Sequence, residues 1–351
     1  MPSVDRPDVD RPDVNQQVLL ASRPDGIPGA GHFRVVDAPV PRPGPGEVLV
    51  RNAYLSVEPA MRGWVNAAPN YLPPVEVGAV MRAFAVGRVA ESRHPDYRPG
   101  DAVTGMFGWQ EWAAVSAAAI DRRADHGPTL GLPISTALGV LGLNGLTAYF
   151  GLLEAGQPRP GETVLVSTAA GSVGSAVGQI ARVAGCRTVG VAGGPEKAAL
   201  CRDAFGFDAA VDYCAGELDA ALERAAPEGV DVYFDNTAGA VSDAVLRRLN
   251  RGARVVVCGT ASVADWAAAP LGPRVERHLL VKRARMQGFI ALDWQHRYPE
   301  GVARLAHWVR EGRLQYRETV LDGIGHAPGA IGMLYRGENM GKLLIRVGPE
   351  A

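Results

Sequence analysis

Residues 163–185 read TVLVSTAAGSVGSAVGQIARVAG. The β-branched run at 163–167 is typical of a buried strand, and apolar residues recur at helical spacing after the glycines. A strand, a glycine turn and a helix in this order direct free backbone N–H groups and the positive end of a helix dipole toward one point, where an anion can bind. The stretch therefore predicts the phosphate-binding turn of a dinucleotide site.

Four residues of this turn carry the prediction. Gly171 lets the backbone approach the phosphates, Gly174 lets the helix pack close to the strand, and the N–H groups of Ser172 and Val173 face the anion. Ala169 stands where the usual fingerprint has its first glycine, which indicates a slightly different turn. The alternative is a tight strand-to-helix connection that binds nothing.

The strand predicted at 187–192 indicates which dinucleotide is bound. It ends at Ala192, and Gly193, Gly194 and Lys197 follow. An acidic residue at this place would bond the ribose hydroxyls of NAD and repel a 2′-phosphate. Ala192 removes that repulsion, the glycines leave room, and Lys197 supplies a positive charge. The sequence therefore predicts NADP(H), although Lys197 can also be read as a solvated lysine in the first turn of a helix.

The rest of the chain divides around this stretch. Short β-like segments separated by Pro and Gly turns predict a barrel-like domain first, and longer helical periods that alternate with apolar strands predict a doubly wound α/β domain with a parallel sheet afterwards. A helix is expected at 301–314, and a strand at 341–347 should return to the first domain. The β-like segments lie at 48–57, 86–92 and 101–116, and the further parallel strands at 230–236 and 254–260. The expected organisation is a disordered tail at 1–17, a barrel-like catalytic domain at 18–143 and 314–351, and a Rossmann domain at 144–313.

Composition excludes several classes of protein. The 351 residues include 36 Lys and Arg against 37 Asp and Glu, so no basic excess is available for nucleic acid. Glycines and prolines interrupt the uncharged stretch 126–153, which argues against a membrane span. The seven histidines are scattered, and the four cysteines lack the close spacing of a metal site. We expect no metal and a reduced, cytoplasmic location; the cysteines are Cys186, Cys201, Cys214 and Cys258.

Several further motifs occur in the order of one known family. They include LSVEPAMRG at 55–63, FGWQEW at 107–112, LGLNGLTAYFGLL at 141–153, VYFDNTAG at 232–239 and GENMGKLLIRV at 337–347. With these motifs the chain resembles the zinc-independent branch of the medium-chain dehydrogenase/reductase superfamily that contains the prostaglandin reductases and bacterial curcumin reductases.

The resemblance implies a chaperonin-10-like barrel formed from both chain ends, with a Rossmann domain inserted between them. It also implies a homodimer and NADPH-dependent reduction of the carbon–carbon double bond of small, electrophilic α,β-unsaturated ketones or aldehydes. Carried over motif by motif, it implies that the cofactor touches Gly193, Lys197, Tyr213, Asn236, Cys258, Phe289, Ile290, Ala291 and Asn339. The alternatives are that Asn236 caps a turn, that Cys258 is a small core residue and that Phe289 is ordinary packing.

Two departures from the family concern the substrate. Related chains usually carry a tyrosine in the motif that here reads Glu58 to Arg62, where this chain has Ala60. A second tyrosine, after the VCG motif, is replaced by Ala264. We expect a wider and less polar pocket, suited to a bulky polycyclic or acyl substrate. Tyr54, Trp109 and Trp266 are candidate replacements, each equally well explained as core packing.

The leading hypothesis is therefore an NADPH-dependent ene-reductase. An NADPH quinone reductase shares the fold and the cofactor site and differs only in the pocket. An NADPH-binding sensor or scaffold without turnover is the alternative from outside the enzymes.

Overall fold

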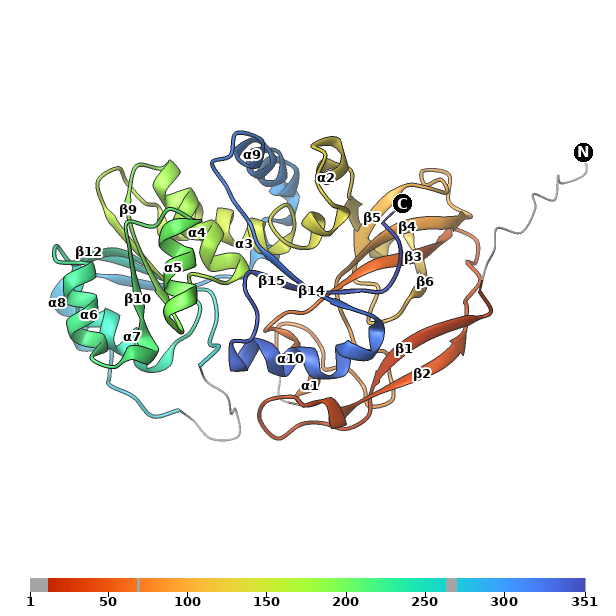
Figure 1. Cartoon of the computed structure of the whole chain (residues 1–351), viewed down its shortest axis with the longest axis horizontal. Coiled ribbons are helices and arrows are strands. Elements are labelled where there is room, and N and C mark those ends of the chain that lie inside the picture. The colour runs from red at the N-terminus through yellow and green to blue at the C-terminus, as the bar shows by residue number, and fades with distance from the viewer. Residues whose placement is uncertain (1–11, 68–69, 263–269, 351) are drawn as a thin grey trace, which may run out of the picture.

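The structure is a computed structural model that describes residues 12–67, 70–262 and 270–350. It contains a parallel sheet with its helices, a larger and mostly antiparallel sheet, and a two-stranded ribbon. In Figure 1 the parallel sheet lies on the left and the antiparallel sheet on the right, and α9 lies between them. Segments from both ends of the chain build the right-hand part.

Six parallel strands form the first sheet in the order β10-β9-β8-β11-β12-β13. The chain leaves β8 in one direction for β9 and β10 and then returns past β8 to β11, so the order reverses between β8 and β11. In open α/β sheets, ligands bind at the carboxyl ends of the strands beside such a reversal. The strands are β8 (Thr163–Ser167), β9 (Arg187–Ala192), β10 (Ala209–Asp212), β11 (Val230–Asp235), β12 (Leu249–Val257) and β13 (Arg285–Gly288).

Helices cover both faces of this sheet, as the sequence predicts for a doubly wound fold. Val164 and Val166 of β8 pack into the cluster on one face, and Leu165 between them packs into the cluster on the other. The first face is covered by α3 (Leu143–Phe150), α4 (Ser172–Val183), α5 (Pro195–Asp203) and α9 (Tyr298–Arg310). The second face is covered by α6 (Leu218–Ala225) and α7 (Gly239–Leu246), and α8 (Glu276–Lys282) packs beside β12.

The second sheet runs in the order β14-β15-β3-β4-β5-β7, and β6 also pairs with β3. Its pairs are antiparallel except for β14 with β15. The closing strand β15 pairs with β3, which confirms that the C-terminal segment returns to the first domain. The strands are β3 (Glu47–Ser56), β4 (Ala85–Ser92), β5 (Ala102–Gly105), β6 (Trp112–Ser116), β7 (Ile120–Arg123), β14 (Glu318–Asp322) and β15 (Lys342–Arg346).

The ribbon corrects one expectation. Its strand β1 (Val14–Leu20) pairs antiparallel with β2 (Phe33–Pro39), so residues 14–17 are not part of a disordered tail as predicted. Val18 and Leu20 bury their side chains in the barrel core, and this burial holds the strand in place. The outer part of that prediction, residues 1–11, lies outside the described residues.

The remaining helical segments connect these layers. The α-helices are α1 (Met61–Val65), α2 (His126–Thr129) and α10 (Ala327–Arg336). The short 3₁₀ and π segments are η1 (Ala30–His32), η2 (Ala117–Ala119), η3 (Ile134–Leu138), η4 (Gly151–Gly156), η5 (Tyr213–Ala215), η6 (Ala291–Arg297) and η7 (Ile324–His326).

Some predicted bounds differ from the structure. The predicted strand at 101–116 is two strands, β5 and β6, because Gly108 takes a positive φ of 79° between them. The predicted helix at 301–314 is α9, which begins at Tyr298 with a proline in its first turn and ends at Arg310, shortly before Gly312 at φ +70°. Turn chemistry therefore set these limits, not hydrophobic periodicity.

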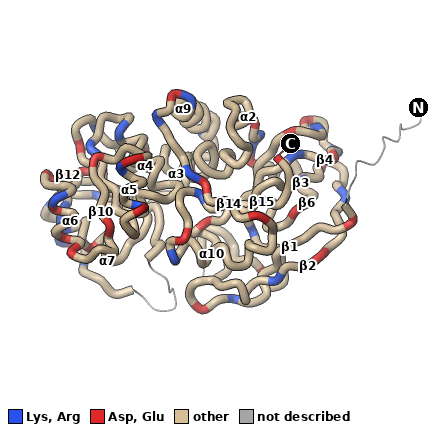
Figure 2. Tube along the Cα trace, in the orientation of Figure 1, with Lys and Arg blue, Asp and Glu red and all other residues tan. Residues whose placement is uncertain are grey.

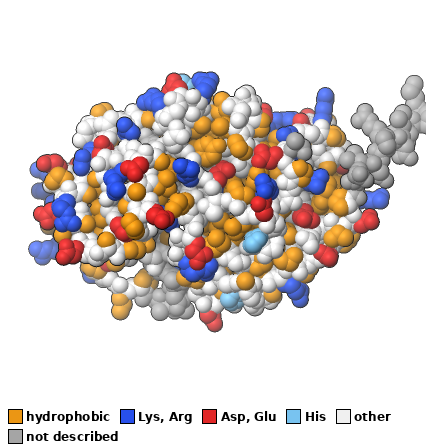
Figure 3. All heavy atoms as spheres, in the orientation of Figure 1, with side chains coloured by type: hydrophobic (Ala, Val, Ile, Leu, Met, Phe, Trp, Pro, Cys, Tyr) orange, Lys and Arg blue, Asp and Glu red, His pale blue; other side chains and the backbone are white. Residues whose placement is uncertain are grey.

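Charges of both signs are distributed over the whole trace (Figure 2). The face in Figure 3 mixes acidic, basic and apolar side chains and carries no extended patch of one sign. Among the described residues, no helix has the length and apolar composition needed to cross a bilayer.

Candidate active site

The glycine turn lies where β8 ends and α4 begins. Thr168 takes φ +53°, and the Gly171 N–H donates to its carbonyl oxygen at 2.9 Å, which closes the turn. A Cβ at Gly174 would lie 2.2 Å from the same oxygen, so only glycine allows the helix this approach. The N–H groups of Ser172 and Val173 belong to the first turn of α4, where no helical carbonyl precedes them. This turn can therefore accept an anion.

A second segment meets the turn from the barrel side. The Gly341 N–H donates to the Ala170 carbonyl oxygen at 3.0 Å, and Gly341 forms an isolated parallel bridge with Gly171. Gly341 takes φ +68°, and the Asn339 side-chain amide donates to its carbonyl oxygen at 2.8 Å. Asn339 thus lies beside the glycine turn, held by its own loop. The junction between the two parts of the molecule passes through this point.

The end of β9 carries the small residues of its sequence, with two neighbours from η5 and β10 packed against them. Ala192 is buried, and Gly194 takes φ +90° before α5 begins. A Cβ at Gly193 would lie 2.9 Å from the Tyr213 hydroxyl, so this tyrosine packs directly on the glycine. Sequence reasoning missed one neighbour: the Asp212 carboxylate, at the end of the adjacent strand β10, accepts the Gly194 N–H at 2.7 Å.

Lys197 reaches across the junction. Its Nζ donates to the Gly337 carbonyl oxygen, at the end of α10, at 2.7 Å. Burial lowers the pKa of Lys197, and Cys214 partly offsets this effect. The amine is therefore partly dehydrated and is bonded to a neutral carbonyl group.

The ends of β8, β11 and β12 are bonded to one another. The Asn236 side-chain amide donates to the Ser167 carbonyl oxygen at 2.7 Å, and the Cys258 N–H donates to the Asp235 carbonyl oxygen at 2.8 Å. Asp235 itself is buried, and its Oδ1 accepts the Tyr233 hydroxyl at 2.9 Å. Burial raises the pKa of the Cys258 thiol to about 12, and Asp235 adds to this effect, so the thiol is protonated at neutral pH.

The segment after β13 lies against the face of the parallel sheet that α3, α4, α5 and α9 cover. Phe289 packs edge-on against Phe234, with ring centroids 6.0 Å apart. A Cβ at Gly151 would lie 2.3 Å from the Phe289 ring, so the packing alternative for this residue is a real contact. Ile290 is 37% exposed and remains available to a ligand, whereas Ala291 is buried.

Two of the three aromatic residues suggested for the substrate lie elsewhere. Tyr54 is buried in the barrel, and its hydroxyl donates to Glu350 Oε1 at 2.5 Å. Trp109 has no exposed surface, and its indole N–H donates to the Ser56 carbonyl oxygen at 3.1 Å. The core-packing alternative therefore describes both residues: Tyr54 lies on β3, and Trp109 lies in the loop between β5 and β6, and both side chains are buried in apolar clusters. Trp266 and Ala264 lie outside the described residues.

A buried ion pair that sequence reasoning missed lies at the junction. The Lys342 ammonium donates to Glu58 Oε1 at 2.7 Å, and the Ser56 hydroxyl donates to the same oxygen at 2.6 Å. The Asn144 amide donates to Glu58 Oε2 at 3.3 Å. These four residues come from the LSVEPAMRG, LGLNGL and GENMGK motifs, so three of the motifs quoted from the sequence converge here.

Two further tyrosines were also missed. Burial raises the pKa of Tyr71, Trp64 opposes the rise, and Glu58 and Cys258 add to it. Tyr71 remains 49% exposed. Tyr298 is buried, its hydroxyl has no partner among the described residues, and it lines a small pocket together with Glu58. No family motif or strand pattern marks either tyrosine.

Comparison with known proteins identifies the family. Residues 16–122 match the protein-family model that is described as the N-terminal domain of oxidoreductase. Residues 172–308 match the family model that is described as zinc-binding dehydrogenase. The chain is 44% identical to NADPH-dependent curcumin reductase of Escherichia coli, over 95% of this chain and 97% of that protein. The chain belongs to the medium-chain dehydrogenase/reductase family, in its curcumin and prostaglandin reductase branch.

Further members of this branch agree in sequence and in fold. Prostaglandin reductase 1 of Bos taurus is 38% identical over 92% of this chain and 95% of its own length. The chain is 39% identical in sequence to CurA from Vibrio vulnificus, whose crystal structure was determined in complex with NADPH. The two structures superpose with a TM-score of 0.89 over 95% of this chain and 99% of that one. In this medium-chain dehydrogenase/reductase, residues 12–67, 70–262 and 270–350 contain no group of three or more His, Cys, Asp or Glu side chains placed to hold a metal ion.

Proposed function

We propose that this protein uses NADPH to reduce the carbon–carbon double bond of α,β-unsaturated ketones or aldehydes. The observation that carries the proposal is the 44% identity, over nearly the whole of both chains, to an NADPH-dependent curcumin reductase. Curcumin itself is a conjugated enone, so the relative's name specifies this class of bond. The arrangement at the end of β9 supports NADPH as the reductant.

The residues present fit the cofactor. The first-turn N–H groups of Ser172 and Val173 would hold the diphosphate at the positive end of α4. Gly193 and Lys197 would receive the 2′-phosphate, with Tyr213 against the same end. Gly171 and Gly174 keep the turn open. The rest of the cofactor would be lined by residues that follow β11, β12 and β13 and by one residue before β15: Asn236, Cys258, Phe289, Ile290, Ala291 and Asn339.

When bound, NADPH supplies the hydride that goes to the β-carbon of the substrate. The protein positions the two reactants, excludes water and stabilises the negative charge that develops on the carbonyl oxygen. The Cys258 thiol, with its raised pKa, stays neutral and adds no charge to the pocket. The chemistry also requires a hydrogen bond to the carbonyl oxygen and a proton that reaches the α-carbon, and a hydroxyl of the chain, a ribose hydroxyl or a bound water can supply them.

Tyr71 is our candidate for that donor. Its side chain is half exposed, and burial is the main cause that raises the pKa of its hydroxyl, with Glu58 and Cys258 adding to the rise. A tyrosine whose pKa is raised keeps its proton at neutral pH and can donate a hydrogen bond to an enolate. It would replace the hydroxyl groups that Ala60 and Ala264 lack.

A substrate panel tests the proposed reaction. NADPH consumption is followed with enones, enals, quinones and simple ketones, and the products are analysed to identify the reduced bond. We expect saturated ketones or aldehydes from the enones and enals. Oxidation of NADPH by quinones alone would replace the proposal with a quinone reductase, and tight NADPH binding without any turnover would indicate a sensor.

Variants separate the cofactor part from the substrate part. Lys197→Gln should raise the Kd for NADPH about tenfold or more and leave that for NADH unchanged, because one charge-assisted phosphate contact is lost. Lys282→Gln, at the end of α8, is the matched control. Tyr71→Phe should lower kcat for enones and leave both Kd values unchanged; an unchanged kcat would remove Tyr71 from the mechanism.

The proposal includes a cytoplasmic homodimer. Support for the dimer comes from β13, the last strand of the parallel sheet, whose residues are all exposed. Leu280, Val281 and Met286 are 79%, 56% and 38% exposed in the same region. An exposed edge strand can pair with another chain. Analytical ultracentrifugation should find a dimer that Leu280→Glu with Met286→Glu converts to a monomer.

A further inference from the structure

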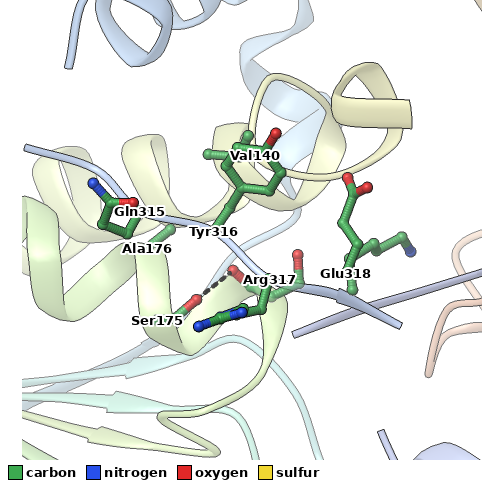
Figure 4. A pocket seen from close by; sticks show the side chains of 9 residues that line it. Val140, Ser175, Ala176, Gln315, Tyr316, Arg317 and Glu318 are labelled. Carbon is green, nitrogen blue, oxygen red and sulfur yellow. Dashed lines mark hydrogen bonds between the residues drawn. The ribbon is translucent and has the colours of Figure 1, made fainter. Parts of the chain in front are cut away.

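The guanidinium of Arg317 lies free beside the first turn of α4. Arg317 lines a narrow pocket together with Ser172, Ser175 and Lys342. Figure 4 shows its side chain extended toward Ser175, on the side of α4. The residue is exposed, and among the described residues its side chain makes no hydrogen bond or ion pair. This arginine was not a candidate from the sequence.

The backbone holds Arg317 against the glycine turn. The Lys342 N–H donates to the Arg317 carbonyl oxygen at 2.9 Å, so Arg317 pairs with the start of β15. A Cβ at Gly341 would lie 2.9 Å from the Cβ of Arg317, and the Gly341 N–H is bonded to the Ala170 carbonyl oxygen at 3.0 Å. Gly341 therefore lies between Arg317 and the phosphate-binding turn and contacts both, although Arg317 belongs to the barrel side.

The neighbouring charges leave this guanidinium without a counterion. Glu318 follows Arg317 in the chain, but its carboxylate points the opposite way (Figure 4) and accepts the Ser135 hydroxyl at 2.8 Å. The Lys342 ammonium is buried and occupied by Glu58 and by the Val57 carbonyl oxygen. In the described part of the chain, Arg317 is thus an unpaired cation alongside the first turn of α4, near the positive end of the helix, an arrangement that a bound anion would stabilise.

We propose that Arg317 binds the diphosphate of the dinucleotide from the barrel side, opposite the N–H groups of α4. The inference rests on the proposed function, because it takes NADPH as the ligand of the glycine turn. Guanidinium groups bind phosphate oxygens through paired hydrogen bonds. The cofactor would then be bonded to both parts of the molecule, so binding it would also fix their junction.

A ligand panel tests this assignment by binding alone. NADPH, NADH and 2′-phospho-ADP-ribose contain the diphosphate, whereas 2′,5′-ADP contains a single 5′-phosphate. Arg317→Gln should raise the Kd of the first three by the same factor, about tenfold or more, and that of 2′,5′-ADP by clearly less. Lys197→Gln should weaken the three ligands that carry a 2′-phosphate and leave NADH unchanged.

Arg313→Gln is the matched control, since Arg313 lies on the same segment and is also exposed. Within the described residues its guanidinium forms an ion pair with Glu311 alone, at 3.7 Å. Arg317→Lys should recover part of the affinity, and the free energy of unfolding of Arg317→Gln should match that of the wild type. Equal Kd values for Arg317→Gln and Arg313→Gln, or an equal loss for 2′,5′-ADP, would overturn the assignment. Failure of the wild type to bind NADPH would instead refute the proposed function.

Discussion

The two sides of the junction are built in different ways. On the side of the parallel sheet, the glycine turn consists of consecutive residues, and its shape depends on the Thr168 carbonyl oxygen and on Gly174 within the same turn. On the barrel side, Glu58 and Lys342 come from distant segments, and Asn144 of α3 donates to Glu58 from across the junction, so these three residues meet only in the folded chain. The first side depends on local backbone geometry and the second on buried charge, so substitutions should affect them differently.

Removal of Glu58 should have the largest effect on stability. Glu58→Ala leaves the Lys342 ammonium buried without its partner, and breaking a buried pair in this way costs about 3–5 kcal/mol. Chemical denaturation measures the loss. The double variant Glu58→Met with Lys342→Met should be clearly more stable than Glu58→Ala; if it is equally unstable, packing and not charge holds this side together.

A substitution at Gly174 tests the local side. Gly174→Ala brings a Cβ to 2.2 Å from a backbone oxygen that cannot move away, so the turn must shift, with an expected cost of about 1–3 kcal/mol and weaker binding of NADPH and NADH alike. Gly171→Ala is the control for stability alone, because its Cβ would lie 3.0 Å from the Thr168 Cγ2 atom and 3.2 Å from the Thr168 carbonyl oxygen. Similar losses in the free energy of unfolding of both variants would contradict the close approach at Gly174. Denaturation curves and cofactor titrations supply the readouts.

The pH dependence of cofactor selection tests Lys197, which is near both sides. Because burial lowers its pKa, its charge is lost at a lower pH than that of an exposed lysine. As pH rises through this lowered pKa, the Kd for NADPH should increase about tenfold and approach that for NADH, which stays constant. Titrations over a pH series measure the ratio of the Kd for NADPH to the Kd for NADH. In Lys197→Gln this ratio should not change with pH. A ratio that is constant until exposed lysines titrate would contradict this prediction.

Tyr54→Phe should have the smallest effect. It removes the hydroxyl that donates to Glu350 at 2.5 Å, at an expected cost of about 1 kcal/mol in the free energy of unfolding. Because Tyr54 is buried on β3, in a different sheet from the strand that leads to the glycine turn, kcat and KM for enones should stay at wild-type values. A selective loss of kcat would restore Tyr54 to the substrate pocket.

Much of the cofactor side could be predicted because its determinants are local. Strand β8, the glycine turn and the start of α4 follow one another in sequence, and β9 with Gly193, Gly194 and Lys197 repeats this order. The neighbour Asp212 was missed because it approaches from a different strand. On the substrate side, Tyr54 on β3 and Trp109 in the loop before β6 were misjudged, because an aromatic residue has the same sequence pattern whether it faces a core or a pocket.

The sequence by itself determined the doubly wound sheet, the phosphate-binding turn and the return of the last strand, because periodicity and glycine geometry act over a few residues. Only the tertiary structure decided which side chains meet at the junction: the Glu58–Lys342 pair with Asn144, and Arg317 against the first turn of α4. These contacts join residues far apart in the chain, and burial and charge pairing become defined only when the two sheets are brought together.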